Sequence, residues 1–136
     1  MKNLIVAMAV LVTGLVTAQK SSLEIEMKGF KNNDGVVIVG LYNSEGKFLK
    51  TTCKGKKSHL KNKKANVIFE GLEKGEYAVM IYQDENLNGK LDSNFMGIPT
   101  EDYMASNDSK GFMGPPKYIN AKFLVANNSK IVININ

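Results

Sequence analysis

The chain has 136 residues, a formal net charge of +5 and 43% hydrophobic residues. All 18 basic residues are lysine, which argues against a dedicated nucleic-acid or phosphate-binding protein, because such sites favour the planar, bidentate guanidinium group of arginine. The single cysteine, Cys53, excludes an intrachain disulfide framework. A chain of this length is typical of one domain that buries its own core.

The first 18 residues have the pattern of a secretory signal peptide. Lys2 supplies a positive start, the apolar run Leu4–Val16 is too short to span a bilayer, and small or modest residues precede a cleavage point after Ala18. We therefore expect a signal peptide over residues 1–18 and one domain over residues 19–136. The mature protein is expected to be exported to the periplasm or the extracellular space and to lack a transmembrane segment.

Strands are indicated along most of the remaining chain. Leu23, Ile25 and Met27 alternate with charged residues, as in a half-buried strand, and Asp34-Gly35 is a hairpin turn signal. Repeated turn signals and the lack of a convincing amphipathic helix predict an all-β fold: a single antiparallel β-sandwich of about seven strands, of which the immunoglobulin-like arrangement is one form. The segments expected to form strands cover residues 22–30, 35–43, 65–72, 76–84, 121–125 and 130–136.

Two segments lack clear periodicity. The first, residues 48–64, is interpreted as an exposed loop with room for a short edge strand or a helical turn, and its lysines cluster between residues 54 and 64. The second, residues 86–118, is expected to be one long ordered loop, because a disordered segment would lack its apolar residues. These residues are expected to anchor the loop on the sheet: Phe95, Met96, Ile98, Tyr103, Phe112 and Met113.

The stretch "DENLNGKLDSN" has the ligand spacing of a calcium loop. Calcium prefers six to eight oxygen ligands, which a helix-loop-helix site supplies from alternate loop positions with a glycine at the sixth. Phe95 stands where that site has its bidentate glutamate, and a strand precedes the loop, so a calcium loop on another scaffold is predicted. A polar turn is the alternative interpretation. The predicted ligands are Asp84, Asn86, Asn88, the Lys90 carbonyl, Asp92 and, from further along the segment, Glu101.

The segment "GLEKGEYAVMIYQDENLNGKLDSNFMGIPTEDY", followed by "SN" and "GPPKYINAKF", resembles a secreted bacterial family, domain of unknown function 2141. The resemblance implies a β-sandwich similar to transthyretin or to carboxypeptidase regulatory domains. It places Asp84, Asn86, Asn88, Asp92 and Glu101 on the recurring polar positions of the family and implies no activity. The chain departs from the family pattern at Tyr103-Met104-Ala105, where a glycine is usual.

Three functional hypotheses follow. The first is a secreted, non-catalytic module with a calcium-binding loop (Ca2+ as the expected ion). The second is an envelope-associated adhesion protein that binds an anionic polysaccharide, another carbohydrate or a cell-envelope component through the Lys-rich loop 54–64. The third is a hydrolase that uses carboxylates such as Asp84 and Glu101. Cys53 and His59 are not expected to form a catalytic pair, because no third group is evident to orient them.

Overall fold

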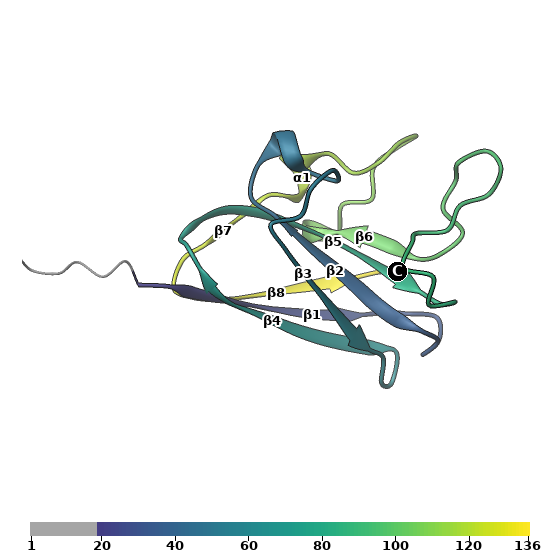
Figure 1. Cartoon of the computed structure of the whole chain (residues 1–136), viewed down its shortest axis with the longest axis horizontal. Helices are drawn as coiled ribbons and strands as arrows, with labels where there is room; N and C mark the ends of the chain where they lie inside the picture. Colours follow the sequence, from purple (N-terminus) through teal and green to yellow (C-terminus); the bar gives the residue numbers. More distant parts are fainter. Residues whose placement is uncertain (1–18) are drawn as a thin grey trace, which may run out of the picture.

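The computed structural model describes residues 19–136, so the expected signal peptide lies outside the described residues. Within this range eight strands form two packed sheets (Figure 1). The all-β sandwich is therefore confirmed. The strands are β1 (Ser21–Lys28), β2 (Val36–Tyr42), β3 (Lys54–His59), β4 (Lys64–Leu72), β5 (Gly75–Asp84), β6 (Tyr103–Ala105), β7 (Phe123–Val125) and β8 (Asn128–Asn134).

One sheet has the strand order β4-β1-β8, and the other has the order β3-β2-β5-β6, with β7 pairing to the first part of β5. All pairs are antiparallel except β1 and β8, which run parallel. Parallel pairing is possible here because the two strands come from opposite ends of the chain and need no tight turn between them.

The main core fills the space between the two sheets. Alternation in β1 buries Leu23, Ile25 and Met27 completely, and they face residues such as Val79 and Ile81 of β5. A second, smaller cluster covers part of the outer face of the larger sheet. It comprises Tyr42, Phe48, Ala78, Met80, Ala105, Tyr118 and Ala121.

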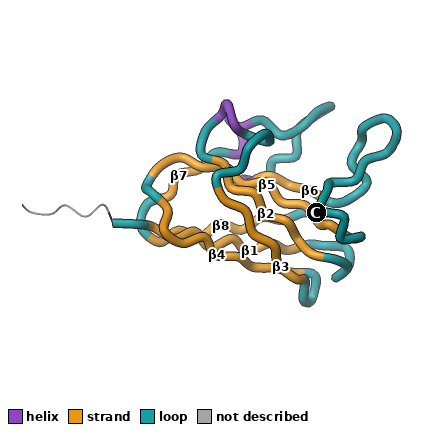
Figure 2. The backbone as a smooth tube through the Cα atoms, viewed as in Figure 1, coloured by secondary structure: helices purple, strands orange, loops and turns teal. Residues whose placement is uncertain are grey.

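In residues 19–136 the helices are η1 (Glu45–Lys47), η2 (Ser106–Asp108) and α1 (Tyr118–Ala121). Figure 2 draws helical backbone in purple. Among the described residues, none of these helices has the length and apolar character needed to cross a membrane.

Two expectations about local structure are wrong. Asp34-Gly35 does not close a hairpin, because β1 and β2 belong to different sheets and the segment between them crosses the sandwich. Gly35 has a φ of +66°, and a Cβ at this position would lie only 1.8 Å from the carbonyl oxygen of Asp84. The glycine therefore permits a close approach between this crossover and the end of β5.

The long segment is ordered but is anchored differently from the expectation. Phe95, Met96, Ile98, Phe112 and Met113 are all exposed. The segment is held instead by β6, by buried Tyr118 and by Ser106, whose hydroxyl accepts the Val79 N–H (3.0 Å) and donates to the Ala121 carbonyl. Backbone pairing in β6 and the buried Ser106 hydroxyl therefore anchor the segment, whereas the exposed apolar side chains do not.

Candidate functional site

The loop between β5 and β6 begins at Asp84, whose side chain is 1% exposed. Its Oδ1 accepts the N–H of Asn88 (3.2 Å) and its Oδ2 accepts the N–H of Gly89 (2.7 Å). Gly89 has a φ of +77°, a conformation that glycine adopts without steric cost. The Asp84 carboxylate therefore folds the chain back into a tight turn immediately after the strand.

Glu101 connects the two ends of the same loop. Its Oε2 accepts the N–H of Glu85 (2.7 Å) and its Oε1 accepts the N–H of Asp92 (2.8 Å), while the residue is only 7% exposed. Hydrogen bonds to an ionised carboxylate are about twice as strong as neutral ones. Glu101 is therefore a brace for the loop backbone, a role that its spacing from Asp84 does not reveal.

Three further side chains meet on the outer side of the loop. Asp92 Oδ2 lies 2.6 Å from the Asn86 amide nitrogen, and Asp92 Oδ1 lies 2.6 Å from the Asn88 amide nitrogen. The amide oxygens turn inward to the backbone: Asn86 Oδ1 accepts the Asn88 N–H (3.3 Å) and Asn88 Oδ1 accepts the Lys90 N–H (3.0 Å). The loop thus forms one hydrogen-bonded unit around Asp92.

All six predicted site residues lie in this unit, where Lys90 takes part through its backbone and the other five fall into two groups. Asp84 and Glu101 hold backbone N–H groups inside the loop, whereas Asn86, Asn88 and Asp92 converge outside it. In residues 19–136 no three His, Cys, Asp or Glu side chains are grouped so that they could hold a metal ion. A cation in the loop would therefore depend on amide and backbone carbonyl oxygens as well as carboxylates.

The lysine-rich segment is not a loop, because residues 54–59 form the edge strand β3 and residue 64 begins β4. Lys54 Nζ donates to the carbonyl of Glu70 (2.9 Å), Lys56 Nζ donates to the carbonyl of Ile68, and the Lys56 ammonium lies 5.7 Å from the centre of the Phe69 ring. Lysines of one sheet edge thereby cover the open backbone of the other, a common protection of exposed edges. These two lysines have a structural role.

Cys53 and His59 do not form a pair. Cys53 is an exposed free thiol just before β3, and His59 is the last residue of that strand. An extended strand of six residues separates the two side chains by roughly 20 Å.

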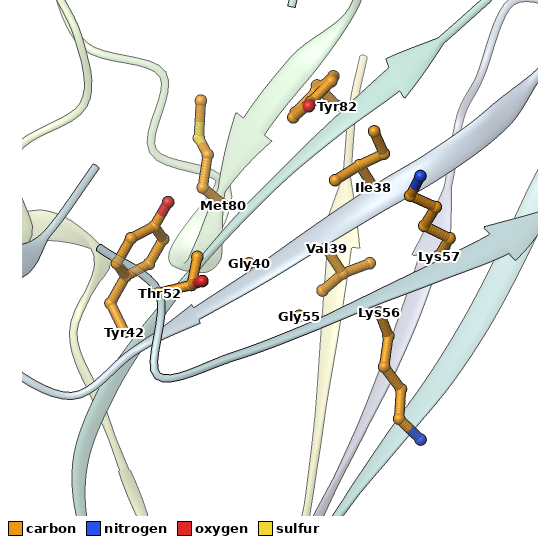
Figure 3. A pocket seen from close by; sticks show the side chains of 10 residues that line it. All are labelled: Ile38, Val39, Gly40, Tyr42, Thr52, Gly55, Lys56, Lys57, Met80 and Tyr82. Atoms are coloured by element: carbon orange, nitrogen blue, oxygen red, sulfur yellow. The ribbon is translucent and has the colours of Figure 1, made fainter. Parts of the chain in front are cut away.

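A hollow of about 420 Å³ opens on the outer face of the larger sheet (Figure 3). Its floor follows one register row, in which Gly40 of β2 pairs with Gly55 of β3 and with Met80 of β5. The neighbouring row, Lys57–Ile38–Tyr82, forms one wall, and Tyr42 with Thr52 forms the other. The absence of side chains on the two paired glycines creates the depression.

The hollow and the loop are physically connected. The Tyr82 hydroxyl donates to the carbonyl of Gly89 (3.1 Å). Burial, with the nearby charges of Asp84 and Glu101, raises the pKa of Tyr82. The hydroxyl of Tyr42 lies over the floor, 3.2 Å from the position that a Cβ on Gly40 would take. The only indication of this hollow in the sequence of β2 is Gly40, which interrupts an otherwise apolar strand.

The fold and the loop define a small β-sandwich with a polar loop at the end of its longest strand. Residues 25–133 match the family described as "Uncharacterized protein conserved in bacteria", domain of unknown function 2141, and the chain belongs to this family. No curated protein and no solved structure matches the chain.

Proposed function

We propose that the protein is an exported, non-catalytic β-sandwich module whose β5–β6 loop binds a calcium ion. The observation that carries the proposal is the convergence of Asn86 and Asn88 on the two oxygens of Asp92, each at 2.6 Å. Three oxygen-bearing side chains at alternate positions of a tight loop match the way in which acyclic calcium loops present their ligands.

Calcium binding requires a half-turn of each amide group, since the amide nitrogens face Asp92 in the ligand-free loop. The rotation replaces two N–H donors by two oxygens, and it breaks the hydrogen bonds that Asn86 Oδ1 and Asn88 Oδ1 accept from the backbone N–H groups of Asn88 and Lys90. Asp84 has lone pairs beyond those used by its two backbone N–H groups, and the Lys90 carbonyl supplies a further oxygen. Glu101 remains the brace that keeps the ligands in place.

The proposed site is a low-affinity one. Two of its side-chain ligands are neutral amides, and calcium affinity falls as the number of charged ligands decreases. We expect a dissociation constant in the range of about 0.1–1 mM, as in other extracellular calcium modules. The bound ion would stabilise the loop and fix the surface around it.

A thermal melt in a calcium titration tests the proposal. At a calcium concentration ten times the dissociation constant, linkage predicts a stabilisation of about 1.4 kcal/mol. Asp92→Asn should abolish the calcium-dependent rise in Tm. Asp108→Asn is the matched control, because Asp108 is also hydrogen-bonded to an asparagine, Asn134, but lies outside the loop. An unchanged Tm of the parent in millimolar calcium, or an equal response of Asp92→Asn, would overturn the proposal.

A second candidate function is the binding of an acidic carbohydrate in the hollow on the larger sheet. The observation that favours it is the combination of an apolar wall, Ile38 and Tyr82, with the Lys57 ammonium on the same register row. Pyranose rings pack their C–H faces on aromatic and aliphatic side chains, and a lysine pairs with a uronic acid carboxylate. Lys57 forms no ion pair with the other residues of the range 19–136.

Titration calorimetry with galacturonate oligomers in the presence of EDTA tests this second function. Lys57→Gln and Gly55→Val should each weaken binding, the first by removing the charge and the second by filling the floor. Lys50→Gln, outside the hollow, is the control. The absence of heat with the parent protein, or unchanged binding by both hollow variants, would refute it.

A further inference from the structure

Two loop tips carry the same exposed sequence, Phe-Met-Gly. In the first tip, residues 94–97, Phe95 is 98% exposed and Met96 69% exposed. In the second tip, residues 111–114, Phe112 is 91% exposed and Met113 93% exposed. Soluble proteins leave single apolar residues at the surface, but two loop tips that each expose a phenylalanine almost fully and a methionine largely indicate an interaction site.

The first tip is a hydrogen-bonded turn. Asn94 Oδ1 accepts the N–H groups of Met96 (2.9 Å) and Ile98 (3.1 Å), and the Asn94 carbonyl accepts the N–H of Gly97 (2.9 Å). The asparagine side chain thereby replaces the contacts that a turn otherwise obtains from the protein body. Phe95 and Met96 are therefore presented to the outside by a defined local structure.

The second tip is equally compact. Gly111 has a φ of +83°, and a Cβ on it would lie 2.4 Å from the carbonyl oxygen of Gly114. The first and last residues of the turn are thus in backbone contact, which leaves Phe112 and Met113 at the apex. Pro115 and Pro116 follow and restrict the backbone of the returning chain.

The two tips differ in their charged neighbours. Segment 93–100 carries no charged residue and lies between Asp92 and Glu101, whereas segment 109–117 contains no acidic residue and has Lys110 and Lys117 on either side of its tip. Lys110 lies over the ring of Tyr103, with its Nζ 5.1 Å from the ring centre. Tyr103 belongs to β6, which connects the two loops, so this contact places a positive charge between their bases.

We propose that the two Phe-Met tips insert together into the surface of an anionic lipid bilayer. Both loops project from the body of the sandwich on the same side in the view of Figure 1, as separate convex points. A protein partner is usually bound through a continuous, well-packed patch, whereas a fluid interface accepts separate apolar points. The unbranched, flexible methionines adapt to such an interface, and the lysines face the anionic head groups.

The proposal goes beyond calcium binding and does not depend on it. The experiment is co-sedimentation of the full mature protein, in EDTA, with vesicles of phosphatidylglycerol and phosphatidylethanolamine. The double variant Phe95→Ser/Phe112→Ser should bind at least about tenfold more weakly, since each substitution removes a large apolar group from the interface. Leu124→Ser is the matched control, because Leu124 is also exposed (75%) but lies on β7.

A fluorescence measurement gives an independent result. The chain contains no tryptophan, so Phe95→Trp and Phe112→Trp each introduce a single reporter. The emission of both should shift to shorter wavelength with anionic vesicles, and Lys110→Gln/Lys117→Gln should weaken binding to them. No binding of the parent to anionic vesicles at low salt overturns the proposal. An equal loss of vesicle binding in Leu124→Ser also overturns it. A third contrary result would be a dimer of the parent that the double variant dissociates, together with reporters whose emission does not shift when vesicles are added.

Discussion

A Cβ on Gly35 would overlap the carbonyl oxygen of Asp84, at 1.8 Å, so the crossover from β1 to β2 touches the end of β5 at the level of the backbone. Val36, the next residue, pairs with Asp84 in the sheet. The residue that starts the polar loop is therefore positioned by a glycine far away in the sequence.

Gly35→Ala should destabilise the protein more than Gly71→Ala. Both glycines have nearly the same φ, +66° and +67°, but a Cβ on Gly71 meets no atom within 4 Å. The Gly71 variant is expected to cost about 1 kcal/mol from backbone strain alone. The Gly35 variant adds a steric overlap and should cost about 2 kcal/mol more. Urea denaturation measures both, and equal losses would show that the close approach is relaxed at little cost.

Glu101→Ala should lower the free energy of unfolding by about 3 kcal/mol, because two backbone N–H groups lose an ionised acceptor. Glu101→Gln keeps one acceptor oxygen and should lose less. Glu73→Ala is the control, since its side chain is 82% exposed in its pair with Lys20. Denaturation curves give the three values. A loss in Glu101→Ala no larger than in Glu73→Ala would contradict the bracing role.

Ser106→Ala should cost about 1–3 kcal/mol, because it leaves the buried N–H of Val79 and the carbonyl of Ala121 without their partner. Ser58→Ala is the comparison, since its hydroxyl only contacts the neighbouring His59 carbonyl at the surface. We expect that substitution to remain within about 0.5 kcal/mol of the parent. Differential scanning calorimetry distinguishes the two variants, and similar melting temperatures would disprove the anchor.

At alkaline pH the stability of the protein should depend on the ionisation of Tyr118. Burial, together with the hydrogen bond to Glu76 (2.8 Å), raises the pKa of Tyr118 to about 12 from its ordinary value of 10.0. A raised pKa in the folded state means that the stabilisation is complete below pH 10 and is lost as the pH rises toward 12. Tyr118→Phe should therefore lose less stability than the parent over this interval, as measured by Tm against pH. Parallel curves for the two proteins would show that Tyr118 does not contribute.

The strands with clear alternation or long apolar runs could be predicted from the sequence. β1 and β5 are examples. β1 buries one face and has alternating apolar residues, whereas β5 is buried on both faces and has a nearly continuous apolar run. β3 was expected only as one alternative, a short edge strand within an exposed loop, because its exposed lysines carry no alternation of apolar residues. β6 was missed because three residues form a strand only when β5 supplies the partner. A turn signal such as Asp34-Gly35 indicates that the chain bends, but it does not indicate which sheet the next strand joins.

The contacts of the candidate loop that could be predicted are those between residues close together in the sequence. Alternate spacing brings Asn86 and Asn88 to one side, and the turn at Gly89 returns the chain so that Asp92 meets them. The function of Glu101 as a brace depends on backbone N–H groups, which have no sequence signature. The exposure of Phe95 and Phe112 was the least predictable feature, because an apolar side chain by itself does not show whether a protein buries it.

The parallel pairing of β1 with β8 has a consequence for biosynthesis. β1 is the middle strand of its sheet, and one of its two partners contains the last strand residue, Asn134. The completely buried Ile133 is therefore absent from the core until β8 has been made. Contacts between such distant parts of a chain form slowly. The three-stranded sheet can therefore be completed only after β8 has been made, so we expect the closing step of folding to follow the synthesis of all the other strands.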